Sequence, residues 1–357
     1  MITFAIVLSV LLLFIILFLL FRIGTLASIF RGSSERAAGT TKTSNRVNGT
    51  LLLLFLIGGG AAFAWSFADA WDTMNLPLAS VHGEWTDNLF WTTMIVIGIV
   101  FVITQILLFF YSYKYQHQDD KRAYYYPHNN KLEIIWTLIP AVVMAALVFG
   151  GWKTWTNITS AAPEDAVVVE IMGKQFNWMV RYPGADGKLG VAKHTLIDAT
   201  NEFGVDFSDK NSHDDIINPL QIHVPKGKPV LLKIRSRDVI HSVFMPHFRL
   251  KMDAVPGMPT KFWFVPSKTT YEMQNETGNP DFKYELACTE VCGRGHFAMR
   301  YVIIVDEPED YEAWLAEQTP FAEQNPQVLA KFSNEASSQL AAKTNAEPKA
   351  EEVKTEL

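Results

Sequence analysis

The stretch that decides the fold spans residues 288 to 305 and reads Cys288-Thr-Glu-Val-Cys292-Gly-Arg-Gly-His296-Phe-Ala-Met299 followed by Arg-Tyr-Val-Ile-Ile-Val. Its first part places thiol, imidazole and thioether groups in one short segment. Its second part is rich in β-branched and aromatic residues, which favour a strand. A donor-rich loop that leads into a strand indicates a metal site built on a β-domain.

Similar strand-like runs occur from Val167 onward and predict a small antiparallel sandwich or barrel. Pro, Gly and Asn separate these runs, which are VVVEIM (167–172), QIHVP (221–225), PVLLKIRS (229–236) and KFWFVP (261–266). The segment from Tyr182 to Pro219 is polar and turn-rich, so surface loops are expected there. After the last run, DEPEDYEAWLAE (306–317) carries a helix-start signal and predicts a short helix.

Four apolar blocks crowd the first half of the chain, and each is near the roughly 20 residues that a helix needs to cross a membrane. They are Met1–Phe21, Leu51–Phe67, Phe90–Tyr111 and Ile134–Trp152. The first block lacks the basic leading region and the small-residue cleavage pattern of a signal peptide, so it is predicted to be a retained helix.

The distribution of basic residues predicts how the chain is oriented in the membrane. The loop after the first block is basic and is predicted to be cytoplasmic, which puts the chain after Trp155 outside; its basic residues are Arg22, Arg31, Arg36, Lys42 and Arg46. The formal net charge of −6 argues against nucleic acid and suits a basic partner. No Cys-x-x-Cys-His motif occurs, so no c-type haem is attached to this chain.

The donor set of the second half favours copper. His241 precedes Cys288, Cys292, His296 and Met299, and together these residues offer two thiolates, two imidazoles and a thioether. Such soft to borderline ligands select copper over magnesium, calcium or manganese. A single blue copper needs one Cys, two His and a weak axial Met, so the second Cys is surplus unless two coppers share both sulfurs.

Two other interpretations compete with copper. The only two cysteines lie in the external half, where free thiols oxidise, so they are either bridged to each other or bound to metal. A Cys288–Cys292 disulfide leaves the nearby His and Met without a role. A zinc site suits Cys and His, but Met is a poor zinc ligand and the fold is not a zinc ribbon.

The expected organisation has four parts. They are an extra N-terminal transmembrane helix with a basic cytoplasmic loop (1–50), transmembrane helices within 51–160 (about 51–68, 89–112 and 133–155), an external β-domain with a short C-terminal helix (165–318), and a disordered tail (319–357). The tail is rich in Ala, Glu, Gln, Lys and Ser and has too few large apolar residues to order itself.

Beyond the donor-rich loop, three further segments resemble subunit II of cytochrome c oxidase, the subunit of the haem-copper oxidase family that carries the dinuclear copper centre CuA. They are GKQFNWMVRY (173–182), DVIHSVFMPHFRLKMDAVPG (238–257) and LEIIWTLIPA (132–141). The resemblance covers roughly Gln105 to Leu315, and the loop is its most specific part. It implies transmembrane α-helices followed by an all-β Greek-key cupredoxin sandwich.

The resemblance also implies a role for each metal-ligating residue. Cys288 and Cys292 would bridge two coppers, His241 and Met299 would complete one ion, and His296 with the backbone carbonyl of Glu290 would complete the other. The side chain of Glu290 would reach a magnesium ion shared with subunit I. Its alternative is a solvated loop glutamate.

Two more positions take roles from the resemblance. Glu133 would lie at the entrance of a proton pathway into subunit I, and its alternative is a helix-end carboxylate favoured by the helix dipole. Phe176 stands where the family commonly has the Trp that receives electrons from soluble cytochrome c, and Trp178 is a nearby candidate. An electron donor other than soluble cytochrome c is therefore expected, such as a cytochrome domain held in a supercomplex. His247 and Met258 receive no role.

The function implied is that of subunit II in a proton-translocating cytochrome c oxidase of a bacterial inner membrane, with the copper domain periplasmic. Electrons from a cytochrome c donor would pass through CuA to the haem-copper subunit I, where oxygen is reduced to water. The alternative is a membrane-tethered copper carrier or sensor. A quinol oxidase subunit would lack the copper ligands, and a nitrous oxide reductase would need a propeller domain.

Overall fold

The computed structural model describes residues 2–30, 42–118, 121–330 and 332, and it divides into two compact units. The first unit comprises residues 1–75 and 92–143, and the second comprises residues 76–91 and 144–357. Part of the predicted basic loop, residues 31–41, lies outside the described residues.

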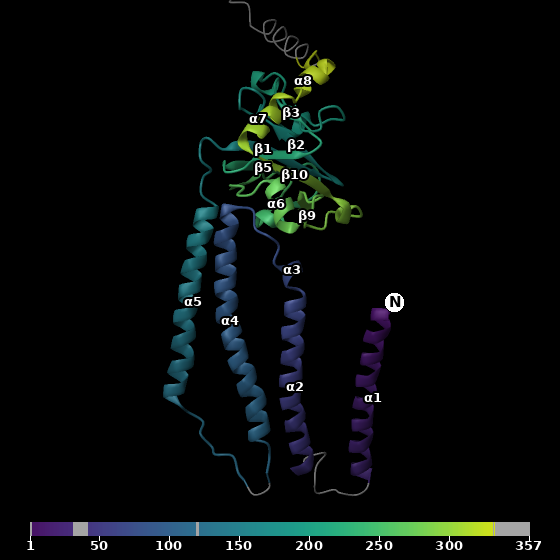
Figure 1. Ribbon diagram of the computed structural model, residues 1–357, viewed down its shortest axis with the longest axis vertical. Helices are drawn as coiled ribbons and strands as arrows, with labels where there is room; N and C mark the ends of the chain where they lie inside the picture. Colours follow the sequence, from purple (N-terminus) through teal and green to yellow (C-terminus); the bar gives the residue numbers. More distant parts are fainter. Residues whose placement is uncertain (1, 31–41, 119–120, 331, 333–357) are drawn as a thin grey trace, which may run out of the picture. The chain divides into compact units, whose positions relative to one another are not determined.

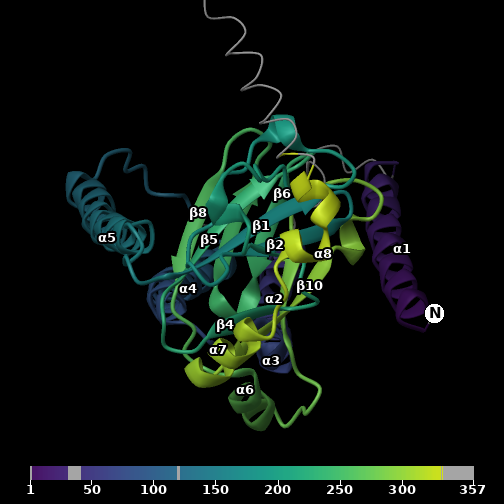
Figure 2. The same cartoon turned by 90° about the horizontal axis from the view of Figure 1, so that it is seen from above.

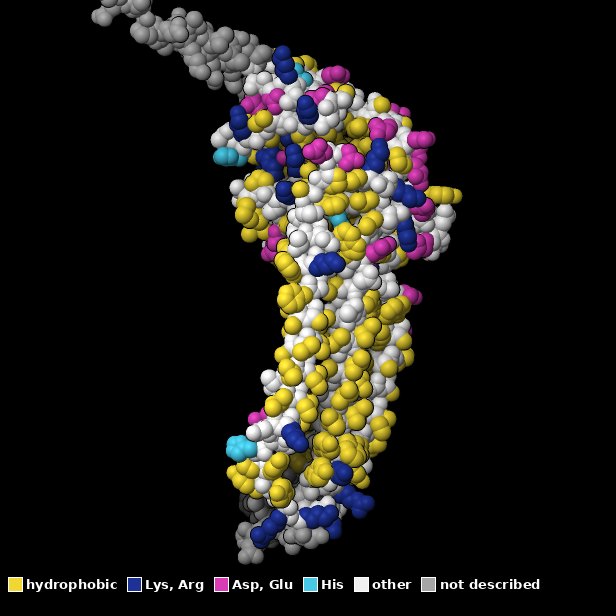
Figure 3. Space-filling model, turned by 90° about the vertical axis from the view of Figure 1, so that its left-hand side faces the viewer, with side chains coloured by type: hydrophobic (Ala, Val, Ile, Leu, Met, Phe, Trp, Pro, Cys, Tyr) yellow, Lys and Arg dark blue, Asp and Glu magenta, His cyan; other side chains and the backbone are white. Residues whose placement is uncertain are grey.

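Long apolar helices dominate the first half of the chain (Figure 1). The helices are α1 (Ile2–Phe30), α2 (Lys42–Asp69), α3 (Trp71–Met74), α4 (Val81–Lys114) and α5 (Asn130–Ile158). Among the described residues, α2, α4 and α5 are long and apolar enough to cross a membrane, and α1 contributes the shorter apolar stretch Val10–Gly24. Hydrophobic side chains are spread along the visible face of the helices, and charged side chains gather over the β-domain and, as Lys and Arg, at the lower end of the helices (Figure 3).

The second half is a β-sandwich of two five-stranded sheets, with strand orders β3-β2-β1-β5-β8 and β4-β10-β9-β6-β7 (Figures 1 and 2). The strands are β1 (Val167–Lys174), β2 (Asn177–Tyr182), β3 (Ile216–Ile217), β4 (Ile222–Pro225), β5 (Val230–Ser236), β6 (His241–Met245), β7 (Leu250–Ala254), β8 (Thr260–Phe264), β9 (Tyr284–Cys288) and β10 (Arg300–Asp306). Three short helices, α6 (Thr270–Thr277), α7 (Pro308–Ala316) and α8 (Phe321–Gln324), complete the domain. The predicted fold class, helices followed by an all-β sandwich, is confirmed.

The prediction of an antiparallel sandwich or barrel is wrong in one respect, because two strand pairs of the sandwich are parallel. β1 pairs with β5 and β10 pairs with β4 in parallel registers. The facing sides of the two sheets form one core, in which Ile171 and Leu232 of the first sheet and Val243 and Ile303 of the second are fully or almost fully buried. Burying each such side chain stabilises the fold by roughly 1.5–3 kcal/mol.

The outer side of the first sheet is covered rather than solvated. Met172 and Met179 point into a second, smaller core that also holds Phe203 and Phe207 from the segment expected to form only surface loops. The ring of Phe207 stacks on Phe321 of α8 at 5.8 Å. The remaining buried members are Val205, Ala322 and Val328.

This second core corrects the predicted start of the disordered tail at residue 319. Phe321, Ala322 and Val328 are spaced so that they reach one side of the chain, and they bury enough apolar surface against the sheet to order the first turns after Pro320. Residues 333–357 of the predicted tail lie outside the described residues.

The segment that leads into α4 packs against the β-domain within the second unit. The backbone N–H of Ala79 donates to the carbonyl of His247 at 2.8 Å, and Nδ1 of His247 lies 2.9 Å from the carbonyl of Pro77. Arg249 forms an ion pair with Asp87 at 2.8 Å. His247, for which the sequence suggested no role, is therefore a structural residue of this junction.

Candidate metal centre

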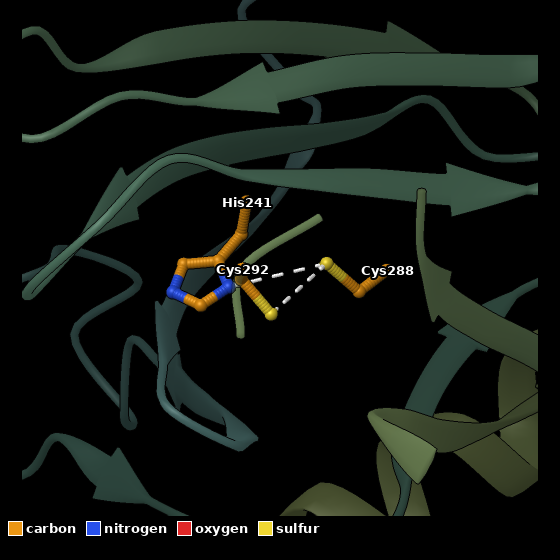
Figure 4. Close-up of side chains that lie close together, drawn as sticks. All are labelled: His241, Cys288 and Cys292. Carbon is orange, nitrogen blue, oxygen red and sulfur yellow. Dashed lines mark hydrogen bonds between the residues drawn. The ribbon is translucent and has the colours of Figure 1, made fainter. Parts of the chain in front are cut away.

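Strand pairing brings the two distant donor segments together. His241 is the first residue of β6 and Cys288 is the last residue of β9, and these strands are antiparallel neighbours with Val243 opposite Cys288. Gly173 on β1 leaves room for the imidazole, because a Cβ there would lie 2.7 Å from Cδ2 of His241. The close approach of His241, Cys288 and Cys292 is visible in Figure 4.

The loop between Cys288 and Met299 closes on itself. The backbone N–H of Cys288 donates to the carbonyl of Met299 at 3.1 Å, which joins the two ends of the loop. Gly293 has φ 134°, a conformation that side chains rarely adopt, and the N–H of His296 donates to its carbonyl at 3.2 Å. The loop thus turns its donors inward.

Six donor groups converge at this point. Sγ of Cys288 lies 3.9 Å from Sγ of Cys292 and 3.2 Å from the carbonyl oxygen of Glu290. Nδ1 of His241 lies 3.9 Å from the Cys288 sulfur. Nδ1 of His296 and Sδ of Met299 lie 3.8 Å and 3.9 Å from the Cys292 sulfur.

The two cysteines are free thiols, so the disulfide interpretation is wrong. A disulfide holds its sulfurs about 2.05 Å apart, well below the 3.9 Å between these two. Four of the donors are shielded from water: His241, Met299, Cys292 and Cys288 are between 0% and 8% exposed, whereas His296 is partly exposed. Burial, with a contribution from Cys288, raises the pKa of the Cys292 thiol to about 11. A buried pair of thiols beside two imidazoles and a thioether fits copper, which would bind the thiolates with release of the thiol protons.

A carboxylate orients the first imidazole. Oδ1 of Asp238 lies 2.8 Å from Nε2 of His241, an arrangement that leaves Nδ1 free to face the sulfurs. Burial tends to raise the pKa of Asp238, but hydrogen bonds from Gln175 N–H, His241 and Val239 N–H outweigh it and lower that pKa. The carboxylate therefore stays charged beside the site.

The turn between β1 and β2 covers the metal loop. The side-chain amide of Gln175 donates to the carbonyl of Cys292 at 2.6 Å, and its backbone N–H donates to Asp238 at 2.7 Å. The ring of Phe176 lies over Gly293 and Gly295, where an added Cβ would clash with it at 2.5–2.9 Å. Phe176 is 41% exposed, so its outer face is open to a partner.

Trp178 is too deeply buried to contact an electron donor, so its predicted role as a contact residue is wrong. It is 1% exposed, and its ring lies beside the imidazole of His241 with centroids 5.9 Å apart. A buried side chain cannot touch the surface of another protein. Sequence reasoning also missed Gln175 and Asp238 as supports of the site, although both lie in segments that resemble the family. The sequence did offer a signal for both supporting residues. Gln175 is a polar residue next to Phe176, and Asp238 is a polar residue three positions before His241.

The remaining predicted site residues are exposed. The residue Glu290 is exposed, and its carbonyl oxygen lies 3.2 Å from the Cys288 sulfur. Glu133 lies in the first turn of α5, and its Oε1 accepts a hydrogen bond from the backbone N–H of Asn129 at 3.3 Å. Glu133 belongs to the first unit and is not part of the donor cluster.

Two family models match most of this chain. The model described as cytochrome c oxidase subunit II, transmembrane domain, matches residues 70–152, and the model described as its periplasmic domain matches residues 167–306. The second match contains every donor of the cluster. The first match covers α4 and most of α5, but not α1 or α2.

Curated relatives carry the same family name. The chain is 35% identical over 290 residues to the "Alternative cytochrome c oxidase subunit 2" of Bradyrhizobium diazoefficiens, which covers 79% of this chain and 98% of that protein. It is 27% identical to the "Cytochrome c oxidase subunit 2" of Thermostichus vulcanus, over 66% of this chain and 76% of the relative. The crystal structure of the periplasmic domain of subunit II (CoxB) of Bradyrhizobium japonicum matches with 24% identity, 44% of this chain, 96% of that chain and a TM-score of 0.31.

These findings agree with the buried donor cluster. The protein is membrane-bound, with its copper domain on the periplasmic side, and it works with other oxidase subunits as the electron-accepting part of an oxidoreductase. Together, the two model matches and the Bradyrhizobium diazoefficiens relative show that the chain belongs to the cytochrome c oxidase subunit II family.

Proposed function

We propose that the donor cluster holds two copper ions and receives electrons from a cytochrome c donor, in an oxidase of a bacterial inner membrane. The observation that carries this proposal is the 3.9 Å separation of two free, buried sulfurs, each with an imidazole Nδ1 within 3.9 Å. A single thiolate would serve one copper. Two thiolates that face each other are suited to bridging a pair.

The ligands divide into two sets in this proposal. Cys288 and Cys292 would hold both ions, His241 and Met299 would complete one, and His296 with the carbonyl of Glu290 would complete the other. When bound, the bridged pair shares one unpaired electron and so changes little on reduction. Asp238 fixes the orientation of His241, and the burial of Met299 keeps water away from the sulfurs.

Glu290 links two ions in the proposal. Its carbonyl faces the cluster, and its exposed side chain is free to bind a magnesium ion shared with subunit I. Carboxylates are ordinary magnesium ligands. A residue that contributes the backbone to one ion and the side chain to the next would connect this centre to the haem-bearing subunit.

Glu133 is proposed as the entrance of a proton pathway into subunit I. Its support is an exposed carboxylate at the start of a helix long enough to cross the membrane. Ionisable groups at such positions are scarce and often functional. The competing role is to cap α5 through the hydrogen bond with Asn129.

Phe176 is proposed as the point where the electron donor makes contact. Its ring covers Gly293 and Gly295 of the metal loop and is 41% exposed. An aromatic side chain that touches both the loop and the solvent suits this role. A cytochrome domain held in a supercomplex remains the proposed form of the donor.

The test is electron paramagnetic resonance with copper counting on the full chain. A seven-line spectrum with two coppers per chain is expected, because the electron couples to both nuclei. Cys292→Ser should remove the shared electron and leave at most one copper. A four-line spectrum with one copper in the unaltered chain would contradict the proposal and favour a copper carrier or sensor.

A further inference from the structure

A tight turn in the segment between β2 and β3 holds a carboxylate in a fixed position. The N–H of Gly204 donates to the carbonyl of Asn201 at 3.0 Å, and Gly204 has φ 67°, a conformation that favours glycine. Asn201 and Phe203 are 2% and 1% exposed, so both neighbours of Glu202 are anchored in the protein interior. The backbone of Glu202 is therefore held on both sides.

The carboxylate of Glu202 joins the ends of two strands. Nζ of Lys174, the last residue of β1, lies 2.8 Å from Oε1 and 2.7 Å from Oε2 of Glu202. Nη1 of Arg237, which directly follows β5, lies 2.9 Å from the same Oε1. The hydrogen bond from Lys174 lowers the pKa of Glu202, and the bond from Arg237 adds to this effect. Two cations thus share one charged carboxylate.

Each of these cations is next in sequence to a residue that supports the metal site. Lys174 directly precedes Gln175, whose side-chain amide holds the metal loop. Arg237 directly precedes Asp238, whose carboxylate orients the first imidazole. The N–H of Gln175 donates to Oδ2 of Asp238 at 2.7 Å, so the two supports also contact each other. Glu202 therefore ties together the two chain segments that carry them.

The backbone pairing of the two strands stops just before the supports. The parallel register of β1 with β5 ends at Gly173, and the N–H of Arg237 donates to the carbonyl of Gly173 at 2.9 Å. Past this point, Glu202 and the bond between Gln175 and Asp238 link the two segments. Contacts made by side chains therefore decide how firmly the supports are held beside the metal site.

The setting of Glu202 makes its two ion pairs stronger than most at a surface. The side chains of Lys174, Glu202 and Arg237 are 25%, 33% and 26% exposed, and pairs as exposed as these usually contribute little, because long side chains lose freedom. Here the backbone of Glu202 is already fixed. Removing its charge would also leave two neighbouring cations without their shared partner, and these cations would repel each other.

We propose that Glu202 is a positioning residue of the metal centre, which keeps Gln175 and Asp238 in contact by binding the cations beside them. This inference rests on the proposed function, in which the donor cluster holds two coppers. It also connects the second core to the metal site, because Phe203 of that core directly follows Glu202. A segment far from the metal ligands in sequence thereby influences how rigidly they are held.

The first measurement requires no copper. Glu202→Gln keeps the shape of the side chain and removes its charge. Backbone amide hydrogen exchange of the copper-free full chain in detergent should become about threefold to fivefold faster in residues 173–176 and 237–240, and exchange in β9 should stay unchanged. Unchanged exchange in both segments would overturn the inference.

The second measurement uses the copper-loaded full chain. Glu202→Gln should shift the copper hyperfine pattern and release copper to a chelator about threefold to fivefold faster. Lys174→Gln added to Glu202→Gln removes one of the two repelling cations, so copper release should slow again. A double variant that releases copper as fast as Glu202→Gln alone would contradict the inference.

Asp206→Asn is the matched control for Glu202→Gln. Asp206 lies in the same segment, and it pairs with Lys193, which is not adjacent to either support. Asp206→Asn should leave the copper spectrum and the exchange of residues 173–176 and 237–240 unchanged. Equal effects of Asp206→Asn and Glu202→Gln would show that Glu202 acts only through the stability of its segment.

The two levels of proposal fail differently. Absence of a two-copper spectrum in the unaltered chain would refute the proposed function itself. A two-copper spectrum in the unaltered chain, together with unchanged exchange and copper release in Glu202→Gln, would refute only the positioning role of Glu202.

Discussion

The side-chain amide of Gln175 donates a 2.6 Å hydrogen bond to the backbone carbonyl of Cys292. Gln175→Leu should therefore loosen the loop around one bridging sulfur, at a cost of about 1 kcal/mol for the lost bond. The expected result is a shifted copper hyperfine pattern and faster loss of copper to a chelator.

A matched control exists for Gln175. The amide of Gln274 donates to the carbonyl of Phe282 at 3.1 Å in another part of the domain. Gln274→Leu should cost similar stability and leave the copper spectrum unchanged. Equal spectra for Gln175→Leu and the unaltered chain would show that Gln175 only stabilises the fold.

The second prediction separates a methionine ligand from a surface methionine. Met299→Leu keeps the volume of a buried side chain, so stability should fall by less than about 1.5 kcal/mol. Losing a weak thioether ligand should nevertheless shift the reduction potential of the centre, which a redox titration measures. Met258→Leu, at a 57% exposed position, should change neither quantity.

The third prediction concerns the contact with the donor. Phe176→Ala should lower the rate of reduction by the cytochrome about tenfold, because an exposed aromatic contact is lost. Trp178→Phe should leave this rate unchanged, since Trp178 is buried and no hydrogen-bond partner is recorded for its indole nitrogen. Stopped-flow kinetics decide the matter, and a normal rate in Phe176→Ala would exclude Phe176 as the contact.

The fourth prediction tests Glu133. Glu133→Ala should slow oxygen turnover of the assembled oxidase about tenfold while copper reduction by the donor stays normal, as expected for a proton-transfer group. Asn129→Ala is the control, because Asn129 accepts from the N–H of Leu132 and caps the same turn of α5. If both variants lose turnover equally, Glu133 acts only through the helix end.

The fifth prediction is a pH dependence of stability. Asp215 is fully buried beside Arg181, and burial raises its pKa to about 7 despite the attraction of that arginine. The unfolded value is near 3.8, so between about pH 4 and pH 7 the folded chain holds a proton that the unfolded chain has lost. Stability should fall as pH rises through that window, by at most about 4 kcal/mol, and stay level above it.

Thermal unfolding of the full chain in detergent between pH 4 and pH 8 measures this slope. Asp215→Asn should flatten it, because the amide does not titrate. Asp214→Asn removes the neighbouring carboxylate, which accepts from the N–H of Asp186 and adds a smaller part to the raised pKa of Asp215, so it should reduce the slope without abolishing it. A slope that survives Asp215→Asn would assign the pH dependence to other groups.

Local patterns were enough to predict the regular strands and the donor residues. β1, β5, β8 and β10 are runs of β-branched or aromatic residues, and Cys288 to Met299 form one continuous segment. β6 and β9 were not predicted, because each holds a metal-ligating residue at one end and lacks the run of aromatic residues that marks β8. Their regularity comes from pairing with each other and with neighbouring strands, which sequence periodicity does not encode.

The residues that support the site, Gln175 and Asp238, could not be predicted from the sequence for a related reason. Gln175 and Cys292 are 117 residues apart, and Gln175 and Asp238 are 63 residues apart. The parallel pairing of β1 with β5 brings Gln175 to Asp238, and the packing of the two sheets brings Gln175 to Cys292. The ordered start of the tail escaped prediction because Phe321 and Val328 gain their partners from Phe207 and its neighbours, far away in the chain.

The junction at His247 sets an order of events during biosynthesis. Pro77 and Ala79 are synthesised before α4, and Asp87 lies near the start of α4. Their partners His247 and Arg249 follow both α4 and α5. The β-domain therefore cannot complete its native contacts until both of these helices have been made and the later segment has reached the same compartment as the earlier one.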